Sequence, residues 1–417
     1  MFNLSSENPA IRIGVALILC SAMWSYVLIA WPLSQRTLTD LYARWYGSRE
    51  LLLHHRDPYS PEITREIQQW HSGRPARPGE DENRFAYPVY VAFLLAPTVT
   101  LRFSPVNDTM FWILLLCCAG TAYLCFRLVG WRPSGPSSVI VVLLSLSSFP
   151  VVHGLRLRQL SLLVGLLIAA SLTLISRSHF SLAGSFLALA TIKPQLTILI
   201  VPWLLVWVFS DWRHRRPLFW SFGLTMVILF ASSELFVSGW MLQFLHGVFA
   251  YVHYTDGRSI LQLLFTPIGG SLVSAVVIFA LGRVCLESRF AASESKNFVF
   301  CSALVLAATV TIIPTMAPHA QVLLFPGLFL IFYQWNAIRD GGRWCRYSAL
   351  CTSLLFAWPW LAAAGFTCIA VPYGKSTAMR FWLVPASTSP LLPLSVMTTL
   401  MIARFQLAEP ARVPLDC

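Results

Sequence analysis

Long runs of apolar residues set the first limit on how this chain can fold. Hydrophobic residues make up 56% of the sequence and charged residues only 12%, which is more apolar surface than one water-soluble core can hide. Lipid must therefore be much of the solvent, which excludes a cytosolic enzyme or a secreted disulfide scaffold. The runs cover about residues 11–32, 86–101, 109–129, 138–150, 161–176, 180–192, 195–209, 218–237, 260–281, 298–316, 321–337, 348–372 and 381–402.

Several of these runs are shorter than the ~20 residues of a straight spanning helix, so we expect some of the helices to be broken or re-entrant. We predict an all-α polytopic membrane protein, with one integral membrane domain over residues 1–417 and about 12 transmembrane helices. The first run is longer than the apolar core of a signal peptide and is expected to be a retained helix. No internal repeat is visible, which argues against an inverted-repeat transporter.

We interpret the formal charge of +12 as a set of basic residues that determine the orientation of the helices in the membrane. Basic residues are scattered between the apolar runs and do not form one compact basic domain, so nucleic acid is not an expected partner. Arginine-rich connectors at 211–216, 283–296 and 339–346, and a short tail at 403–417, are typical of the cytoplasmic side. The polar segment 34–85 then faces outward, and we expect a multi-pass protein of the plasma (inner) membrane with its active site on the extracytoplasmic face.

This first extracytoplasmic loop is the only long polar stretch of the sequence. It carries 8 acidic residues and 8 arginines, and is therefore neutral. Leu41, Trp45 and Leu52 lie at helical spacing, and Ser60-Pro61-Glu62 is typical of the start of a second helix. We predict two amphipathic helices on the membrane surface that bracket a cavity. The alternative is a solvated loop with one capped helix.

The number of crossings between this loop and residue 211 must be odd, although six apolar runs lie there. We favour residues 86–129 as one broken passage, because it leaves the arginines at 127, 132 and 177 on the cytoplasmic side. The alternative is a single long helix over 180–209.

Asp40 stands where the first membrane helix has just emerged. A carboxylate at the lipid–water boundary is suited to accept a proton from a hydroxyl nucleophile. The alternative role is N-cap of the helix that follows, a frequent use of Asp.

Lys193 lies between Ile192 and Pro194 in an apolar stretch, and the chain has only three lysines against 27 arginines. A buried ammonium needs an anion as its partner. We therefore predict a site for a lipid phosphate at Lys193, with Arg156, Arg158 or His319. Lys193 snorkelling to the interface and a structural His319 are the alternatives.

Other polar groups are candidates for sugar binding or for solvated surface. Glu234 and His253 could contact a sugar, whereas the acidic run 80–83 is expected to be solvent-facing and no metal site is predicted. The sequence has no Walker loop, no GxGxxG, no HExxH and no DxD pair, so an energy-rich donor should be membrane-borne.

Three stretches of the chain resemble the polyprenol-phosphate-mannose-dependent mannosyltransferases of glycosyltransferase family 87 (GT87), in the wider GT-C class. The first runs from Asp40-Leu41-Tyr42 through Asp57-Pro58-Tyr59 and Phe85-Ala86-Tyr87-Pro88 to Leu94-Leu95-Ala96-Pro97. The second combines Arg158-Gln159, where the family has Gly-Gln, with Ala190-Thr191-Ile192-Lys193-Pro194. The third combines Pro318-His319 with Leu323-Leu324-Phe325-Pro326.

This resemblance implies a GT-C fold and an inverting glycosyltransferase. Asp40 would be the catalytic base, with Lys193, His319, Arg158 and Arg156 near the donor phosphate. The donor would be a polyprenyl-monophosphate sugar, with mannose expected, and the acceptor a hydroxyl of a lipid-linked or cell-envelope glycan. No cofactor or divalent metal is expected. Residues expected to bind the sugar or the acceptor are Asp57, Tyr59, Tyr87, Gln159, Glu234 and His253.

Two other functions share some of these features. A transporter or flippase of lipid-linked sugars needs the same apolar bulk and phosphate site, but not Asp40 as a base. A structural scaffold does not account for Lys193 or for the polar groups that gather on one side.

Overall fold

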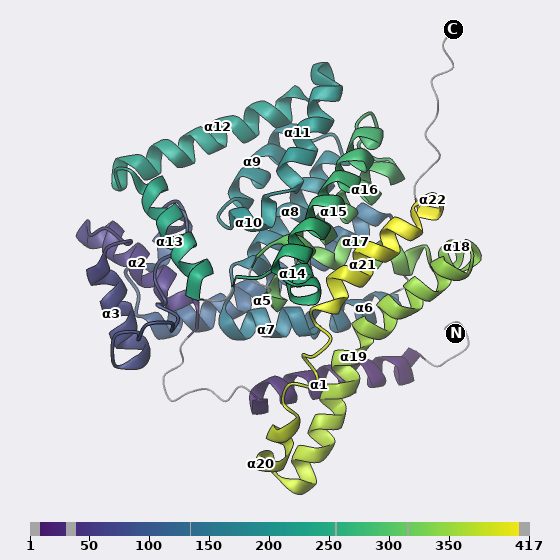
Figure 1. Ribbon diagram of the computed structural model, residues 1–417, viewed down its shortest axis with the longest axis horizontal. Helices are drawn as coiled ribbons and strands as arrows, with labels where there is room; N and C mark the ends of the chain where they lie inside the picture. Colours follow the sequence, from purple (N-terminus) through teal and green to yellow (C-terminus); the bar gives the residue numbers. More distant parts are fainter. Residues whose placement is uncertain (1–8, 31–38, 134, 255–256, 315–316, 408–417) are drawn as a thin grey trace.

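The computed structural model describes residues 9–30, 39–133, 135–254, 257–314 and 317–407, and every regular element in these ranges is a helix (Figure 1). The predicted all-α class is confirmed. Five helices are long and apolar enough to cross a membrane, or six if the helix pair α6 (Gly135–Leu146) and α7 (Phe149–Leu157), bent by 52°, forms one span. The five are α1 (Pro9–Ala30), α5 (Phe103–Val129), α12 (Trp212–Phe236), α15 (Pro267–Ser288) and α19 (Arg343–Tyr373).

The remaining apolar helices are too short to span a bilayer alone, so a total of about 12 crossings stays a prediction. Large apolar side chains on the long helices are exposed, among them Leu224 and Val227 on α12 and Val276 and Phe279 on α15. Such surfaces are consistent with an integral membrane protein. The short apolar helices are α8 (Ser161–Ile175), α9 (Phe180–Ala190), α11 (Ile200–Ser210), α16 (Lys296–Ile312), η2 (Pro318–Leu324) with α17 (Phe325–Tyr333), and α21 (Leu391–Ile402).

The polar segment after α1 forms two helices, α2 (Leu41–His54) and α3 (Pro61–Ser72), as its periodicity predicts. Ser60 caps α3 by accepting a hydrogen bond from Ile63 N (3.3 Å), and Pro61 occupies the first helical position. Leu41, Trp45, Ile63 and Ile67 are buried. These residues belong to the same continuous apolar core as residues of α5, α8 and α16, so the loop is packed onto the membrane helices.

One helix that is long and apolar enough to cross a membrane follows the loop. Residues 91–98 form only the short helices α4 (Val91–Leu95) and η1 (Ala96–Thr98), and α5 begins at Phe103. This is the arrangement expected of a single broken passage over residues 86–129. The alternative long helix over 180–209 is not formed, because α9 ends at Ala190 and α10 (Pro194–Thr197) precedes α11.

The centre of the protein is formed by α16, whose residues from Phe298 to Thr311 are all buried, together with α8 and η2. Helix α8 packs against α5 and α9, and α12 lies along α9. Figure 1 shows α12 along one edge and α13 (Trp240–Tyr254) turning from its end toward α2 and α3. This arrangement brings α13 to the first loop.

A second apolar cluster joins α1 to α19, with Tyr26 and Phe366 in edge-to-face contact at 5.1 Å between ring centroids. The connecting helices of the second half are α14 (Ile260–Phe265), α18 (Trp335–Asp340), α20 (Lys375–Ala378), η3 (Met379–Phe381) and α22 (Arg404–Leu407). Of the predicted tail 403–417, residues 408–417 lie outside the described part of the chain.

Candidate functional site

Asp40 occupies the N-cap position of α2, but its side chain makes no capping hydrogen bond. Its backbone N–H donates to the Leu157 carbonyl at the end of α7 (3.1 Å), and its carboxylate Oδ2 accepts a hydrogen bond from Gln159 Nε2. The capping alternative is therefore wrong for the side chain. The carboxylate is held by an amide from a segment far away in sequence.

Gln159 and Lys193 continue this network into the protein. Gln159 Oε1 accepts from Lys193 Nζ (3.0 Å), which also donates to Ser161 Oγ (2.6 Å) and lies 3.4 Å from His319 Nε2. Lys193 is 8% exposed, so it does not snorkel to the surface. It lies at the break between α9 and α10, where Pro194 begins the new helix.

His319 lies in η2 and stacks on His153 of α7, with ring centroids 5.8 Å apart. Gly154 permits this close approach, because a Cβ there would lie 3.1 Å from His319 Cβ and 3.0 Å from Leu162 Cδ2. His319 Nδ1 is buried and has no hydrogen-bond partner among the described residues. A buried ring nitrogen without a partner is costly, so a ligand contact there would be favourable.

Arg44 is a site residue that the sequence analysis missed. Its guanidinium lies 4.5 Å from the centre of the Tyr87 ring, and Lys193 Nζ lies 5.9 Å from the same ring centre. Arg44 Nε is enclosed and, within the described ranges, has no hydrogen-bond acceptor. The signal was available, since Arg44 follows Asp40 by one helical turn, but seven other arginines share the neutral loop.

We call Asp40, Gln159, Lys193, His319, Arg44 and Tyr87 the Asp40 cluster. It contains two cations, Arg44 and Lys193, and one carboxylate, Asp40. Enclosed charges are stable when they are balanced, so the cluster is suited to bind one further anion. The neutral Gln159 separates the carboxylate from Lys193 and leaves it able to accept a proton.

Arg158 and Arg156 lie at the end of α7. Arg158 adopts the left-handed conformation (φ 54°), and its guanidinium donates to the carbonyls of Asn107 (3.0 Å) and Leu155 (2.6 Å). Its contacts are thus with backbone and with the Phe111 ring, 5.0 Å away. Arg156 is half-buried in the last turn of α7.

Asp57 and Tyr59 shape the loop beside the Asp40 cluster. Asp57 Oδ1 accepts from Tyr59 N (2.9 Å), which is a local turn contact. The Tyr59 hydroxyl donates to the Tyr87 carbonyl (2.6 Å) and so fixes the segment that carries the Tyr87 ring.

Glu234 and Glu80 have local partners. Glu234 accepts from Gly239 N (2.7 Å) in a local turn after α12. His253 belongs to α13, and its side chain is outside the described part of the structure. In the acidic run, Glu80 pairs with Arg74 (2.7 Å), and this hydrogen bond, with one from the Arg77 backbone, lowers the pKa of Glu80 to about 2. No group of three or more His, Cys, Asp or Glu residues that could hold a metal ion occurs in the part of the chain that the structure describes.

Comparison with known proteins gives one match. No curated protein sequence and no solved structure matches the chain significantly. The model of glycosyltransferase family 87 matches residues 85–318, which is more than half of the sequence and includes Tyr87, Gln159 and Lys193. Asp40 and Arg44 precede this range, and His319 follows it directly. The chain therefore belongs to glycosyltransferase family 87 and is a glycosyltransferase.

Proposed function

We propose that the protein transfers mannose from a polyprenyl-monophosphate sugar to a hydroxyl of a lipid-linked or cell-envelope glycan, with inversion, on the outer face of the membrane. The observation that supports this most directly is the composition of the Asp40 cluster. One carboxylate is held by a neutral amide, next to two cations, so the cluster carries one positive charge that no anion of the cluster balances. Transfer from a phosphate-linked sugar requires a base for the acceptor hydroxyl and, beside it, a site that binds the phosphate anion.

Asp40 is the proposed base. Its carboxylate accepts a hydrogen bond from the neutral Gln159 amide. The acceptor hydroxyl gives its proton to Asp40 as its oxygen forms a bond to the anomeric carbon. The bond from that carbon to the phosphate oxygen breaks on the opposite side, which inverts the configuration. Polyprenyl phosphate leaves with the bonding electrons.

Lys193, Arg44 and His319 are proposed to bind the donor phosphate. Lys193 Nζ approaches His319 Nε2 to 3.4 Å, and both Lys193 and Arg44 lie near the Tyr87 ring. These groups stabilise the charge that grows on the leaving oxygen, so we propose that no divalent metal is needed. Arg158 is assigned a positioning role, because its guanidinium contacts are with backbone carbonyls.

The test is transfer by the purified, full-length protein in lipid nanodiscs. The donor is polyprenyl-phosphate mannose and the acceptors are short alkyl glycosides. The expected result is a glycoside of inverted anomeric configuration and one polyprenyl phosphate per product. Use of a nucleotide sugar would overturn the donor class. Movement of the lipid donor across vesicles without product would overturn the assignment of a transferase reaction in favour of transport.

A further inference from the structure

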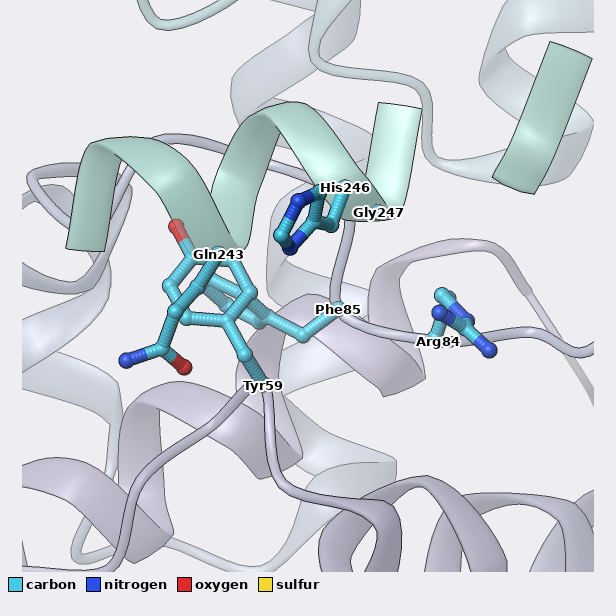
Figure 2. A pocket seen from close by; sticks show the side chains of 6 residues that line it. All are labelled: Tyr59, Arg84, Phe85, Gln243, His246 and Gly247. Atoms are coloured by element: carbon cyan, nitrogen blue, oxygen red, sulfur yellow. The ribbon is translucent and has the colours of Figure 1, made fainter. Parts of the chain in front are cut away.

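A cavity separate from the Asp40 cluster lies between α13 and the first loop. Its volume is about 160 Å³, and it is lined by Tyr59, Arg84, Phe85, Gln243, His246 and Gly247. Figure 2 shows Gln243 and His246 on the side of α13 that faces the Tyr59 and Phe85 rings. We call it the α13 pocket. It is small compared with the several hundred Å³ typical of sites for drug-sized ligands.

The aromatic wall of this pocket is held rigidly. Tyr59 and Phe85 meet edge to face at 5.4 Å between ring centroids, and the Tyr59 hydroxyl is bound to the Tyr87 carbonyl (2.6 Å). Phe85 lies against Gly47 of α2 so closely that a Cβ there would be 2.5 Å from Phe85 Cδ2. Phe85 is 1% exposed and supports the half-buried Tyr59, so Tyr59 is the ring that this wall presents to a ligand. An aromatic ring of this kind can pack against the C–H face of a sugar.

The polar wall has unused hydrogen-bonding groups. Gln243 makes one long hydrogen bond, to the Ser238 carbonyl (3.4 Å), and His246 makes none with the described residues. Arg84 is ion-paired with Glu82, while its Nε is enclosed and has no acceptor in the described ranges. A carboxamide, an imidazole and a charge-neutralised guanidinium suit neutral hydroxyl groups better than a phosphate.

We infer that the α13 pocket binds a sugar ring of the acceptor. This inference rests on the proposed function and adds the place where the acceptor is recognised. Phe85 of the pocket is two residues from Tyr87, whose ring lies near both Arg44 and Lys193, and Tyr59 of the pocket donates to the Tyr87 carbonyl. The pocket therefore adjoins the Asp40 cluster. The donor is held by its phosphate at those cations and by its lipid chain. The pocket, built from the polar loop and a surface helix, is left for the hydrophilic substrate.

The experiment compares Gln243→Ala and His246→Ala on α13 with two control variants, Gln69→Ala and His54→Ala, at exposed positions of the first loop. Octyl α-mannoside is the acceptor probe, and polyprenyl-phosphate mannose is the donor. Each pocket variant should raise the acceptor KM about fivefold to tenfold, as expected for one lost hydrogen bond. The donor KM and the slow hydrolysis of donor in the absence of acceptor should not change, and the controls should match the wild type.

Three results separate the possibilities. An increase in donor KM and a loss of hydrolysis would mean that the pocket holds the donor sugar, which overturns the inference. An unchanged acceptor KM in the double variant Gln243→Ala/His246→Ala would overturn it as well. If the wild type transfers no sugar from any lipid donor, the proposed function fails. Saturation-transfer NMR of octyl α-mannoside would then still test the pocket. A saturation-transfer signal that is weaker in the pocket variants than in the wild type and the controls would support a sugar site here. Equal signals in all these proteins would reject it.

Discussion

Gln159 donates a hydrogen bond to the Asp40 carboxylate although 119 residues of sequence separate them. The backbone reinforces this contact, because Asp40 N also donates to the Leu157 carbonyl, two residues before Gln159. The start of α2 is thus fixed to the end of α7 at two points. The same Gln159 side chain accepts from Lys193, so one carboxamide sets the orientation of both the proposed base and a proposed phosphate ligand.

Asp40→Asn should reduce sugar transfer about 10²-fold to 10⁴-fold, which is the usual contribution of a general base. The variant should fold normally, because the asparagine side chain has the size of the carboxylate and its remaining oxygen can accept the hydrogen bond from Gln159. Transfer from purified lipid donor measures the first effect, and thermal unfolding in detergent the second. Persistent transfer by a folded Asp40→Asn variant would reject Asp40 as the base.

Gln159→Leu should lower kcat about tenfold to a hundredfold and also raise the donor KM. The reason is that it removes two hydrogen bonds to charged groups, one to Asp40 and one from Lys193. Initial rates at varied donor concentration check both constants. Loss of stability alone, with unchanged kcat per folded molecule, would show that Gln159 only supports packing.

Chelation should leave transfer unchanged. If Lys193, Arg44 and His319 balance the charge of the leaving phosphate, no metal ion is needed for that purpose. Addition of about 5 to 10 mM EDTA, an excess over any bound ion, should then leave the initial rate unchanged. A metal-dependent nucleotide-sugar transferase assayed in parallel serves as control for the chelator. Inhibition that Mg²⁺ or Mn²⁺ reverses would contradict the proposal.

The first loop should lose order in acid. Arg56 donates to Glu66 (2.6 Å) and to Glu50 (2.8 Å), and the hydrogen bonds from Arg56 and Tyr46 lower the pKa of Glu66 below its ordinary 4.5. A lowered folded pKa means that the stabilisation is present above pH 4.5 and is lost as the pH falls toward the folded value. Hydrogen exchange of α2 and α3 at pH 7 and near pH 4 (about the unperturbed Glu value) measures this. Glu66→Gln should show a smaller change over the same range.

The sequence could predict those parts that local rules control. Ser60 and Pro61 begin α3, the stripe of Leu41 and Trp45 is buried, and Pro194 marks the break that carries Lys193. The role of Arg44 depends on how α2 packs over Tyr87, and the stacking of His153 on His319 depends on the contact between α7 and η2. No periodicity encodes such contacts between segments. The number of membrane crossings could not be predicted, because apolar helices of 11 to 17 residues have the same sequence pattern whether they cross the membrane or re-enter it.

Arg158 occupies the position where the family pattern has glycine, and its φ of 54° explains the preference. A non-glycine residue in the left-handed region costs about 1 kcal/mol, which the bonds to the Asn107 and Leu155 carbonyls offset here. Arg158→Ala loses these bonds and keeps the strain, whereas Arg158→Gly loses the bonds and relieves it. Arg158→Gly should therefore be more stable than Arg158→Ala by about 1 kcal/mol in thermal or denaturant unfolding. Both variants should keep the wild-type donor KM, because the guanidinium contacts backbone; a donor KM raised as strongly as in Lys193→Met would place Arg158 on the phosphate instead.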